Sequence, residues 1–164
     1  MASRAQVLIP FVIAAVIVGI VGILTIPSDT KLETVNFPKG TIKIDSVVLQ
    51  VEIADTEPAR TRGLMFQEEL PFDKGMIFIF DEEQVISMWM LNMQFPLDVI
   101  WFDSKGDVVH IEKNVVPCKS AIETMTCTFQ NAENRKAKYV LEVTAGFVDK
   151  FNITEESKLQ IISI

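Results

Sequence analysis

Two acidic residues, Asp98 and Glu142, occupy sequence surroundings that could alter their chemistry. Each lies within an apolar run, residues 97–100 for Asp98 and 140–143 for Glu142. A carboxylate in apolar surroundings either pairs with a cation or a hydrogen-bond donor, or its pKa rises. Arg62 is the candidate partner for either acid. A buried acid of this kind is a candidate contact for a bound ligand.

These acids are part of a predicted polar pocket for a small ligand or a peptide. Its predicted members are Arg62, Asn92, Asp98 and Glu142, with Trp89 as the floor. Two structural alternatives stay open. In one, an ion pair fixes a short helix to a sheet; in the other, the carboxylates face water.

Methionines supply a second candidate site. Met88 and Met90 flank Trp89 and would share one face of a strand, and Met93 follows closely. Thioether sulfurs are soft ligands that select Cu(I), so the three methionines are a candidate copper site. Methionine is also a common core residue, which is the structural alternative.

His110 is the single histidine of the chain and lies in an apolar stretch, residues 108–111. A hydrolase would require His110 to converge with Asp98 and Glu142, and the sequence contains no nucleophile elbow. No acidic residue has a spacing that would form a metal triad with this histidine. A partly exposed structural role is the simpler interpretation.

The only two cysteines, Cys118 and Cys127, enclose a polar segment without a Cys-x-x-Cys spacing. This spacing does not fit zinc or thioredoxin-like chemistry. In an oxidising compartment we expect one disulfide that closes a loop. In a reducing compartment they would be two thiols.

The N-terminus carries a predicted membrane segment from Val7 to Ile26, with no charged residue. Twenty helical residues reach roughly 30 Å, the hydrocarbon thickness of a bilayer. The apolar part of a cleaved signal peptide is shorter, roughly 7 to 15 residues. We therefore predict an uncleaved single-pass anchor in residues 1–27, a polar tether in residues 28–40 and one domain in residues 41–164.

The orientation of this anchor is not decided by the flanking basic residues. A very short N-terminal tail and a long C-terminal domain favour a cytoplasmic N-terminus and a domain outside, whether periplasmic, pseudoperiplasmic or extracellular. The cysteine pair agrees with this location. There, Asn152 would be an N-glycosylation acceptor in the sequon Asn152-Ile153-Thr154.

The charge of the chain excludes one class of partner. All 22 acidic residues but only 14 of the 15 basic ones follow the membrane segment, so this part has a net charge of −8. Such a charge argues against binding nucleic acid or an anionic membrane surface. The expected partners are the membrane through its anchor, a membrane-protein complex or a small ligand.

Short β-rich runs separated by turn residues dominate the predicted domain. Predicted strands are residues 41–44 and 47–54, which form a hairpin, then 75–80, 85–90, 97–102, 107–116, 139–143 and 158–162, with a turn at 81–84. Thr56 and Gly63 would begin and end one short helix, and residues 145–150 could form a helical turn. The pattern predicts a mostly β fold, an antiparallel β-sandwich or partly closed barrel with one or two short helices.

Several ordered fragments resemble one family, the domain of unknown function 192. They are residues 59–66 (ARTRGLMF), 70–71, 75–78, Trp89-Met90 with Asn92, 95–98, 117–118 and 139–146. The resemblance covers roughly residues 41–163. It implies a compact β-sandwich-like domain, commonly exported or membrane-tethered, and leaves the biochemical role open.

Two positions depart from the family pattern. The family motif Trp-Met-Lys-Asn has Leu91 in place of its lysine here, and Gln67 stands where the family often has a basic residue. Without these two cations, a site for anions would be weaker. The sequence thus favours a non-catalytic, membrane-anchored binding or accessory domain without a cofactor, with Cu(I) binding or hydrolysis as the alternatives.

Overall fold

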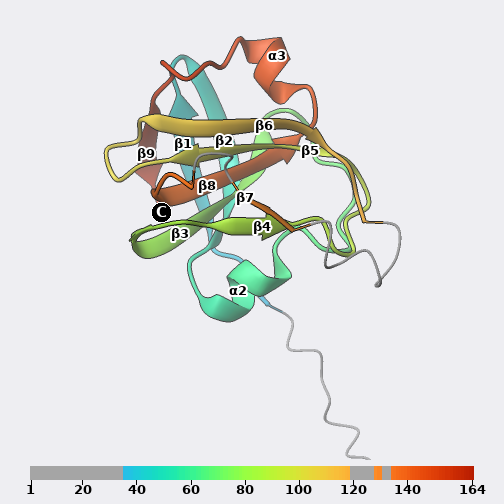
Figure 1. The fold of residues 1–164 in the computed structure, drawn as a ribbon. Helices are drawn as coiled ribbons and strands as arrows, with labels where there is room; N and C mark the ends of the chain where they lie inside the picture. The colour runs from blue at the N-terminus through green and yellow to red at the C-terminus, as the bar shows by residue number, and fades with distance from the viewer. Residues whose placement is uncertain (1–34, 119–127, 131–133) are drawn as a thin grey trace, which may run out of the picture. The chain divides into compact units, whose positions relative to one another are not determined.

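The computed structural model describes residues 35–118, 128–130 and 134–164 (Figure 1). The predicted anchor and most of the predicted tether lie outside these residues. Within the described part of the chain, no helix is long and apolar enough to cross a membrane. Residues 35–164 form one compact unit.

Seven strands form one mixed sheet in the order β6-β5-β8-β3-β2-β1-β9. They are β1 (Lys39–Ile44), β2 (Val47–Ala54), β3 (Lys74–Gln84), β5 (Leu97–Phe102), β6 (Val108–Val115), β8 (Ala137–Thr144) and β9 (Leu159–Ser163). A second sheet pairs β4 (Ser87–Trp89) with β7 (Thr128–Gln130). The helices are α2 (Glu57–Arg62) and α3 (Phe147–Phe151). The predicted mostly β fold with one or two short helices is confirmed, and the described residues form two such helices.

The predicted antiparallel pairing holds for every neighbouring pair of the large sheet except one, because β2 and β3 are parallel neighbours. Parallel strands need a crossover connection of a dozen or more residues. Residues 55–73, with α2, supply it. The described strands also do not form a closed barrel: among these residues, one isolated bridge, Asp107 to Lys158, joins the region before β6 to the region before β9.

Local signals in the sequence correctly predicted the beginning of the domain. β1 and β2 form the expected hairpin, with Ile44 opposite Val47. Thr56 is the N-cap of α2, and its side-chain oxygen accepts a hydrogen bond from the Ala59 N–H. Gly63 ends the helix with a positive φ of 46°.

The predicted turn at residues 81–84 is wrong. β3 continues to Gln84, which pairs with Ala137 of β8 after a shift in register that begins at Ile79. The polar residues 81–84 can belong to a strand because this end of β3 is exposed to solvent. The next predicted strand is shorter than expected and belongs to the small sheet with β7.

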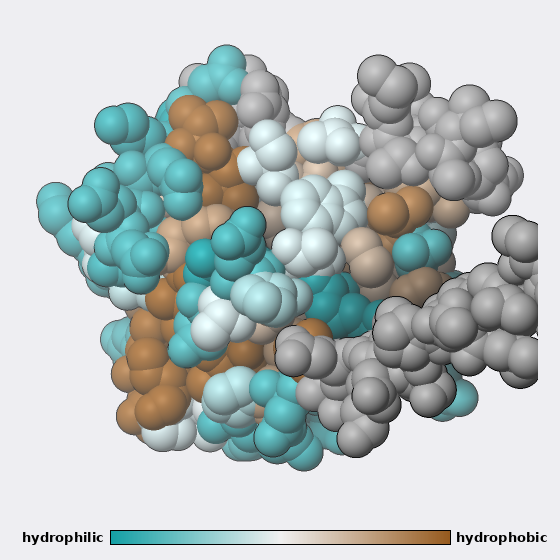
Figure 2. Space-filling model, turned by 90° about the horizontal axis from the view of Figure 1, so that it is seen from below, coloured by the Kyte–Doolittle hydropathy of each residue, from teal (hydrophilic) through white to brown (hydrophobic). Residues whose placement is uncertain are grey.

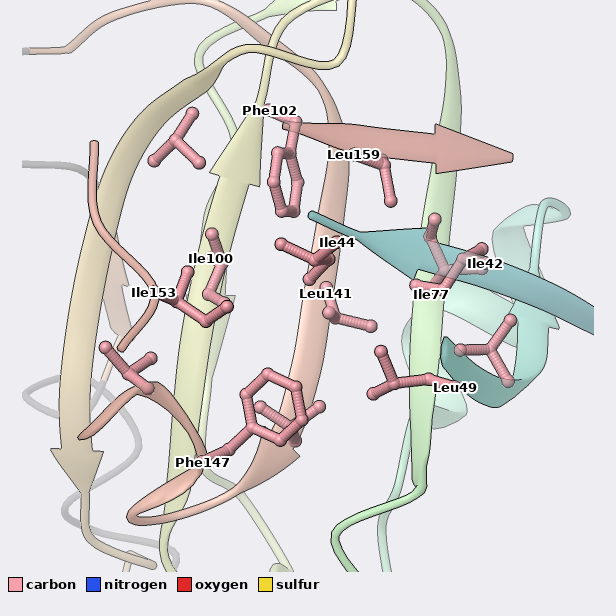
Figure 3. Packing of buried hydrophobic residues seen from close by; sticks show 14 of the residues in the cluster. Ile42, Ile44, Leu49, Ile77, Ile100, Phe102, Leu141, Phe147, Ile153 and Leu159 are labelled. Carbon is pink, nitrogen blue, oxygen red and sulfur yellow. The ribbon is translucent and has the colours of Figure 1, made fainter. Parts of the chain in front are cut away.

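A hydrophobic core lies on each face of the large sheet. The first lies on the α3 side and includes Leu141, Val143 and Phe147 (Figure 3). The second lies on the α2 side and includes Ala59 and Val140. Figure 1 shows the two helices on opposite sides of the strands. Because both faces are covered, every residue of β5 is buried, as its apolar sequence predicted.

The turn before β6 connects this strand to the C-terminal part of the chain. Asp103 Oδ1 accepts hydrogen bonds from the backbone N–H groups of Lys105 and Asp107. Gly106 has a φ of 83°, and its carbonyl accepts a hydrogen bond from Leu159 N–H at 2.8 Å. A side chain at Gly106 would collide with the Leu159 backbone.

Candidate binding cavity around Glu142

A cavity with a volume of about 250 Å³ lies on the α2 side of the sheet. Residues of α2 and the loop after it, of β3, of β4 and the turn after it, and one residue of β8 line it. The β8 residue is Glu142. In Figure 2, which views the molecule from the α2 side, hydrophilic residues lie beside hydrophobic ones.

The side chain of Glu142 is almost fully buried, with a relative exposure of 4%. Its partners across the neighbouring strands are Met76 of β3 and Val99 of β5, both fully buried and apolar. Burial raises the pKa of Glu142 to about 8, because the charged form loses its hydration. At pH 7 this residue is therefore a neutral acid that can donate a hydrogen bond.

No residue of the described part of the chain forms a hydrogen bond or an ion pair with the Glu142 side chain. A buried polar group without a partner normally carries a free-energy penalty of about 1–3 kcal/mol. Since Glu142 lines the cavity, a ligand or water in the cavity could satisfy it. This residue is the main chemical feature of the site.

Helix α2 forms part of the cavity wall, and its ends are well defined. Thr56 caps its first turn, and Gly63 closes its last turn through a hydrogen bond from its N–H to the Ala59 carbonyl. A Cβ atom at position 63 would lie 3.3 Å from the Phe78 ring. Glycine at this position therefore lets the chain turn close to the cavity wall.

Arg60 on α2 is held firmly by the protein itself. Its Nη1 donates hydrogen bonds to the carbonyl oxygens of Asp55 and Ile79, the latter at 2.9 Å. The guanidinium carbon lies 4.9 Å from the centre of the Phe80 ring. Arg60 thus ties α2 to β3 and lends positive charge to the cavity wall.

Arg62 also lines the cavity, but its environment differs. Its guanidinium carbon lies 5.0 Å from the centre of the Phe66 ring, a cation–π contact. Among the described residues it has no hydrogen-bond or ion-pair partner. Its N–H donors therefore remain free to bind an anionic group.

The loop after α2 is joined to the turn after β4 by two residues with left-handed backbone. Phe66 has a φ of 63° and Asn92 a φ of 56°. The Phe66 N–H donates to the Asn92 carbonyl at 3.0 Å, and Asn92 Nδ2 lies 3.9 Å from Met65 Sδ. Asparagine tolerates this conformation, whereas it is rare for a bulky residue such as phenylalanine. Asn92 therefore shapes the segments beside the cavity instead of lining it.

Asp98 lies away from the cavity, on the other side of the sheet. Its carboxylate accepts hydrogen bonds of 2.9–3.0 Å from three backbone N–H groups, those of Asn114, Gly146 and Val148. The expected ion pair with Arg62 is not formed. Asp98 instead fixes the start of α3 to β5 and the end of β6.

The three predicted copper ligands are all buried, and they divide between two places. Met88 and Met93 line the cavity together with Trp89. Met90 lines a separate hollow beside Val115 and Phe129. Copper binding by the three methionines stays a prediction.

His110 is half-buried and lies in β6. Its Nε2 is 3.3 Å from Glu112 Oε2, and its ring centre is 5.4 Å from that of Trp101. These contacts do not include Asp98 or Glu142, the two acids that a hydrolase site would require beside His110. Within the residues that the structure describes, no group of three His, Cys, Asp or Glu side chains could hold a metal ion.

Two other predictions concern covalent chemistry. Cys127 lies outside the described residues, so its disulfide with Cys118 stays a prediction. Asn152 is exposed and forms the left-handed C-cap of α3, with a φ of 53°. This position explains an asparagine structurally, and its glycosylation also stays a prediction.

Of the predicted pocket residues, Arg62, Trp89 and Glu142 line one cavity, whereas Asn92 and Asp98 do not. Arg60, Leu64 and Phe78 line the cavity and were not predicted from the sequence. Arg60 and Leu64 fall in the family-like fragment ARTRGLMF, and this fragment was the available signal. Phe78 resembled any other core residue of an apolar strand.

The fold and the site define a small, mostly β domain with a cavity that is lined by the buried acid Glu142. A family model described as DUF192, Uncharacterized ACR, matches residues 40–161. The chain belongs to this family. A search among curated proteins finds no match.

Two solved structures are similar to this chain. A Sinorhizobium meliloti protein described as a candidate transcription regulator has 29% sequence identity and a TM-score of 0.68, over 77% of this chain and 96% of its own. A protein of unknown function from Novosphingobium aromaticivorans has 25% identity and a TM-score of 0.67, over 78% of this chain and 89% of its own.

Proposed function

We propose that this protein is a non-catalytic binding domain that holds a small organic molecule in the Glu142 cavity. The observation that carries the proposal is a nearly fully buried carboxylic acid, without a partner among the described residues, that lines a largely apolar cavity. Binding sites for small molecules commonly combine apolar walls with a few polar groups that orient the ligand. Glu142 and Arg62 are these polar groups.

The proposed location follows from the sequence. An anchor from Val7 to Ile26 would attach the domain to a membrane, with the domain outside the cytoplasm. In that place, the domain would act as an accessory part of a membrane complex or as a receptor for a solute near the membrane.

Regulation of transcription, suggested by the description of the Sinorhizobium meliloti protein, has less support here. The chain after the membrane segment carries a net charge of −8, which repels the phosphate backbone of nucleic acids. We therefore propose a small ligand and not DNA as the binding partner.

The experiment that tests the proposal is a ligand-detected NMR screen of the full-length protein. The library would consist of organic molecules smaller than typical drugs, since the cavity volume of about 250 Å³ lies below the roughly 300–1,000 Å³ of drug-sized pockets. Molecules that bind the wild-type protein should show no NMR binding signal with the variant Leu64→Trp, because the larger tryptophan side chain would fill the cavity.

A control variant separates cavity binding from surface binding. Glu82→Gln changes an exposed acid near the end of β3 and should keep every hit. Absence of hits, or hits that persist in Leu64→Trp when circular dichroism shows that this variant is folded, would contradict the proposed function.

A further inference from the structure

Two polar groups that line the same cavity have no hydrogen-bond or ion-pair partner in the part of the chain that the structure describes. Arg62 has a cation–π contact with Phe66 but no hydrogen bond or ion pair with any described residue. Glu142 likewise has no hydrogen bond or ion pair with any described residue. No ion pair joins the two residues to each other, so their charged atoms are more than 4.0 Å apart. A ligand between them could satisfy both groups.

The two groups require different chemistry from the ligand. The guanidinium of Arg62 matches a carboxylate, to which it can donate two parallel hydrogen bonds. Glu142 in its charged form matches an ammonium group, and the apolar surroundings strengthen that attraction. The other charged residues that line the cavity, Glu57 and Arg60, both come from α2, and Arg60 is already engaged by the protein.

The walls between these groups are apolar. Leu64, Phe78, Met88 and Met93 line the cavity and are buried. They would accommodate a hydrocarbon side chain. The volume of about 250 Å³ limits the ligand to a size below that of a typical drug molecule, whose pockets are about 300–1,000 Å³.

We propose that the ligand is a free α-amino acid with an apolar side chain, whose carboxylate binds Arg62 and whose ammonium group binds Glu142. This inference rests on the proposed function and names its ligand class. Such an amino acid has two opposite charges close together and an apolar remainder. These features match the two free polar groups and the apolar walls.

The proton balance of this binding follows from the state of Glu142. Burial raises its pKa to about 8, so the free protein holds a proton there at pH 7. When the ammonium group binds, the Glu142 O–H bond breaks, the proton goes to the solvent buffer and the carboxylate stays with the ammonium. Binding therefore releases about one proton for each ligand at pH 6–7.

Isothermal titration calorimetry of the full-length protein tests this proposal with three related probes. L-leucine has both charged groups, 3-methylbutylamine lacks the carboxylate and 4-methylpentanoate lacks the ammonium. We expect L-leucine to bind at least about tenfold more tightly than either of the others, because each of them lacks one of the two charge-assisted contacts, which are roughly twice as strong as neutral hydrogen bonds. Titrations in buffers of different ionisation enthalpy should show the released proton.

Variants of the two contacts provide the controls. Glu142→Gln should abolish the proton release and weaken L-leucine at least about tenfold, and Arg62→Gln should weaken L-leucine but keep the proton release. Glu82→Gln should change neither. Unchanged affinity in folded Glu142→Gln and Arg62→Gln would overturn the proposal.

Other outcomes separate this inference from the proposed function. Equal affinity for 3-methylbutylamine would remove the role of Arg62, and equal affinity for 4-methylpentanoate would remove that of Glu142; each overturns the amino-acid ligand. Failure of all three probes, with other molecules of the NMR screen still bound in the cavity, would also overturn it but would leave the proposed function intact. Failure of both experiments would overturn both.

Discussion

Asp98 and Glu142 lie one register position apart on the neighbouring strands β5 and β8, and they face opposite sides of the sheet. Asp98 is opposite Val143, and Glu142 is opposite Val99. Both acids are buried, but Asp98 accepts three hydrogen bonds from backbone N–H groups, whereas the described residues provide none for Glu142. One acid therefore stabilises the fold, and the other is free to bind.

Replacement of Asp98 should reduce stability and leave the cavity unchanged. Asp98→Asn keeps one oxygen acceptor but replaces the other with an N–H donor, which faces backbone donors. We expect a loss of about 2 kcal/mol in the free energy of unfolding, and a larger loss for Asp98→Ala. Urea unfolding followed by circular dichroism measures both. A loss below about 0.5 kcal/mol for Asp98→Ala would contradict this role.

The stability of the protein should depend on pH through Glu142. Its pKa is about 8 in the folded protein and 4.5 when unperturbed, so between these values only the folded state holds the proton. The free energy of unfolding therefore falls as pH rises through this window, by about 1.4 kcal/mol per pH unit. From pH 5 to pH 8 we expect this residue to contribute a loss of roughly 3–4 kcal/mol.

Glu142→Gln isolates this contribution, because glutamine has a similar shape and does not titrate. The variant should be more stable than the wild type at pH 8, and the difference should shrink toward pH 5. Denaturant unfolding at a series of pH values measures it, with Glu82→Gln as the exposed control. If wild type and Glu142→Gln show parallel pH profiles, the raised pKa is disproved.

Two glycines with positive φ should respond differently to alanine. Gly106 and Gly146 have φ values of 83° and 89°. A Cβ at position 106 would collide with the Leu159 backbone, whereas nothing lies within 4 Å of one at position 146. Gly146→Ala should cost about 1–2 kcal/mol, and Gly106→Ala about 2 kcal/mol more. Thermal or urea unfolding measures the difference. Equal losses in the free energy of unfolding would contradict this prediction, because they would mean that the turn before β6 can shift to accommodate a Cβ atom.

The N-cap of α2 offers a milder test of the cavity wall. Thr56→Ala removes the oxygen that accepts the Ala59 N–H at 3.4 Å. We expect a loss of about 0.5–1 kcal/mol in the free energy of unfolding. Thr56→Ser keeps the hydroxyl and should recover most of this loss. Urea unfolding of both variants measures it, and equal stability of Thr56→Ala and Thr56→Ser would refute the capping role.

Parts of the fold were predictable because their signals are local. The β1–β2 hairpin, the caps of α2 at Thr56 and Gly63 and the wholly buried strand β5 depend on residues close in the chain. The parallel pairing of β2 with β3 was not predictable in this way. It depends on the path of residues 55–73 and on which neighbours cover the strands.

The candidate site shows the same division. Arg62, Trp89 and Glu142 were singled out by residue type, and the structure places them around one cavity. Asp98 has the same kind of apolar sequence surroundings as Glu142, yet it has a different environment. Nothing in residues 97–100 indicates that backbone amides fifty residues away will satisfy its carboxylate.

The amino-acid sequence alone determined the β-rich character, the ends of α2 and the presence of two acids in apolar strands. These properties follow from backbone preferences and from side chains near each other in the chain. Only the tertiary structure decided which acid has hydrogen-bond partners and which lines a cavity. The physical reason is that burial and hydrogen bonding of Asp98 and Glu142 depend on strands and loops that are distant in sequence and adjacent only in the folded protein.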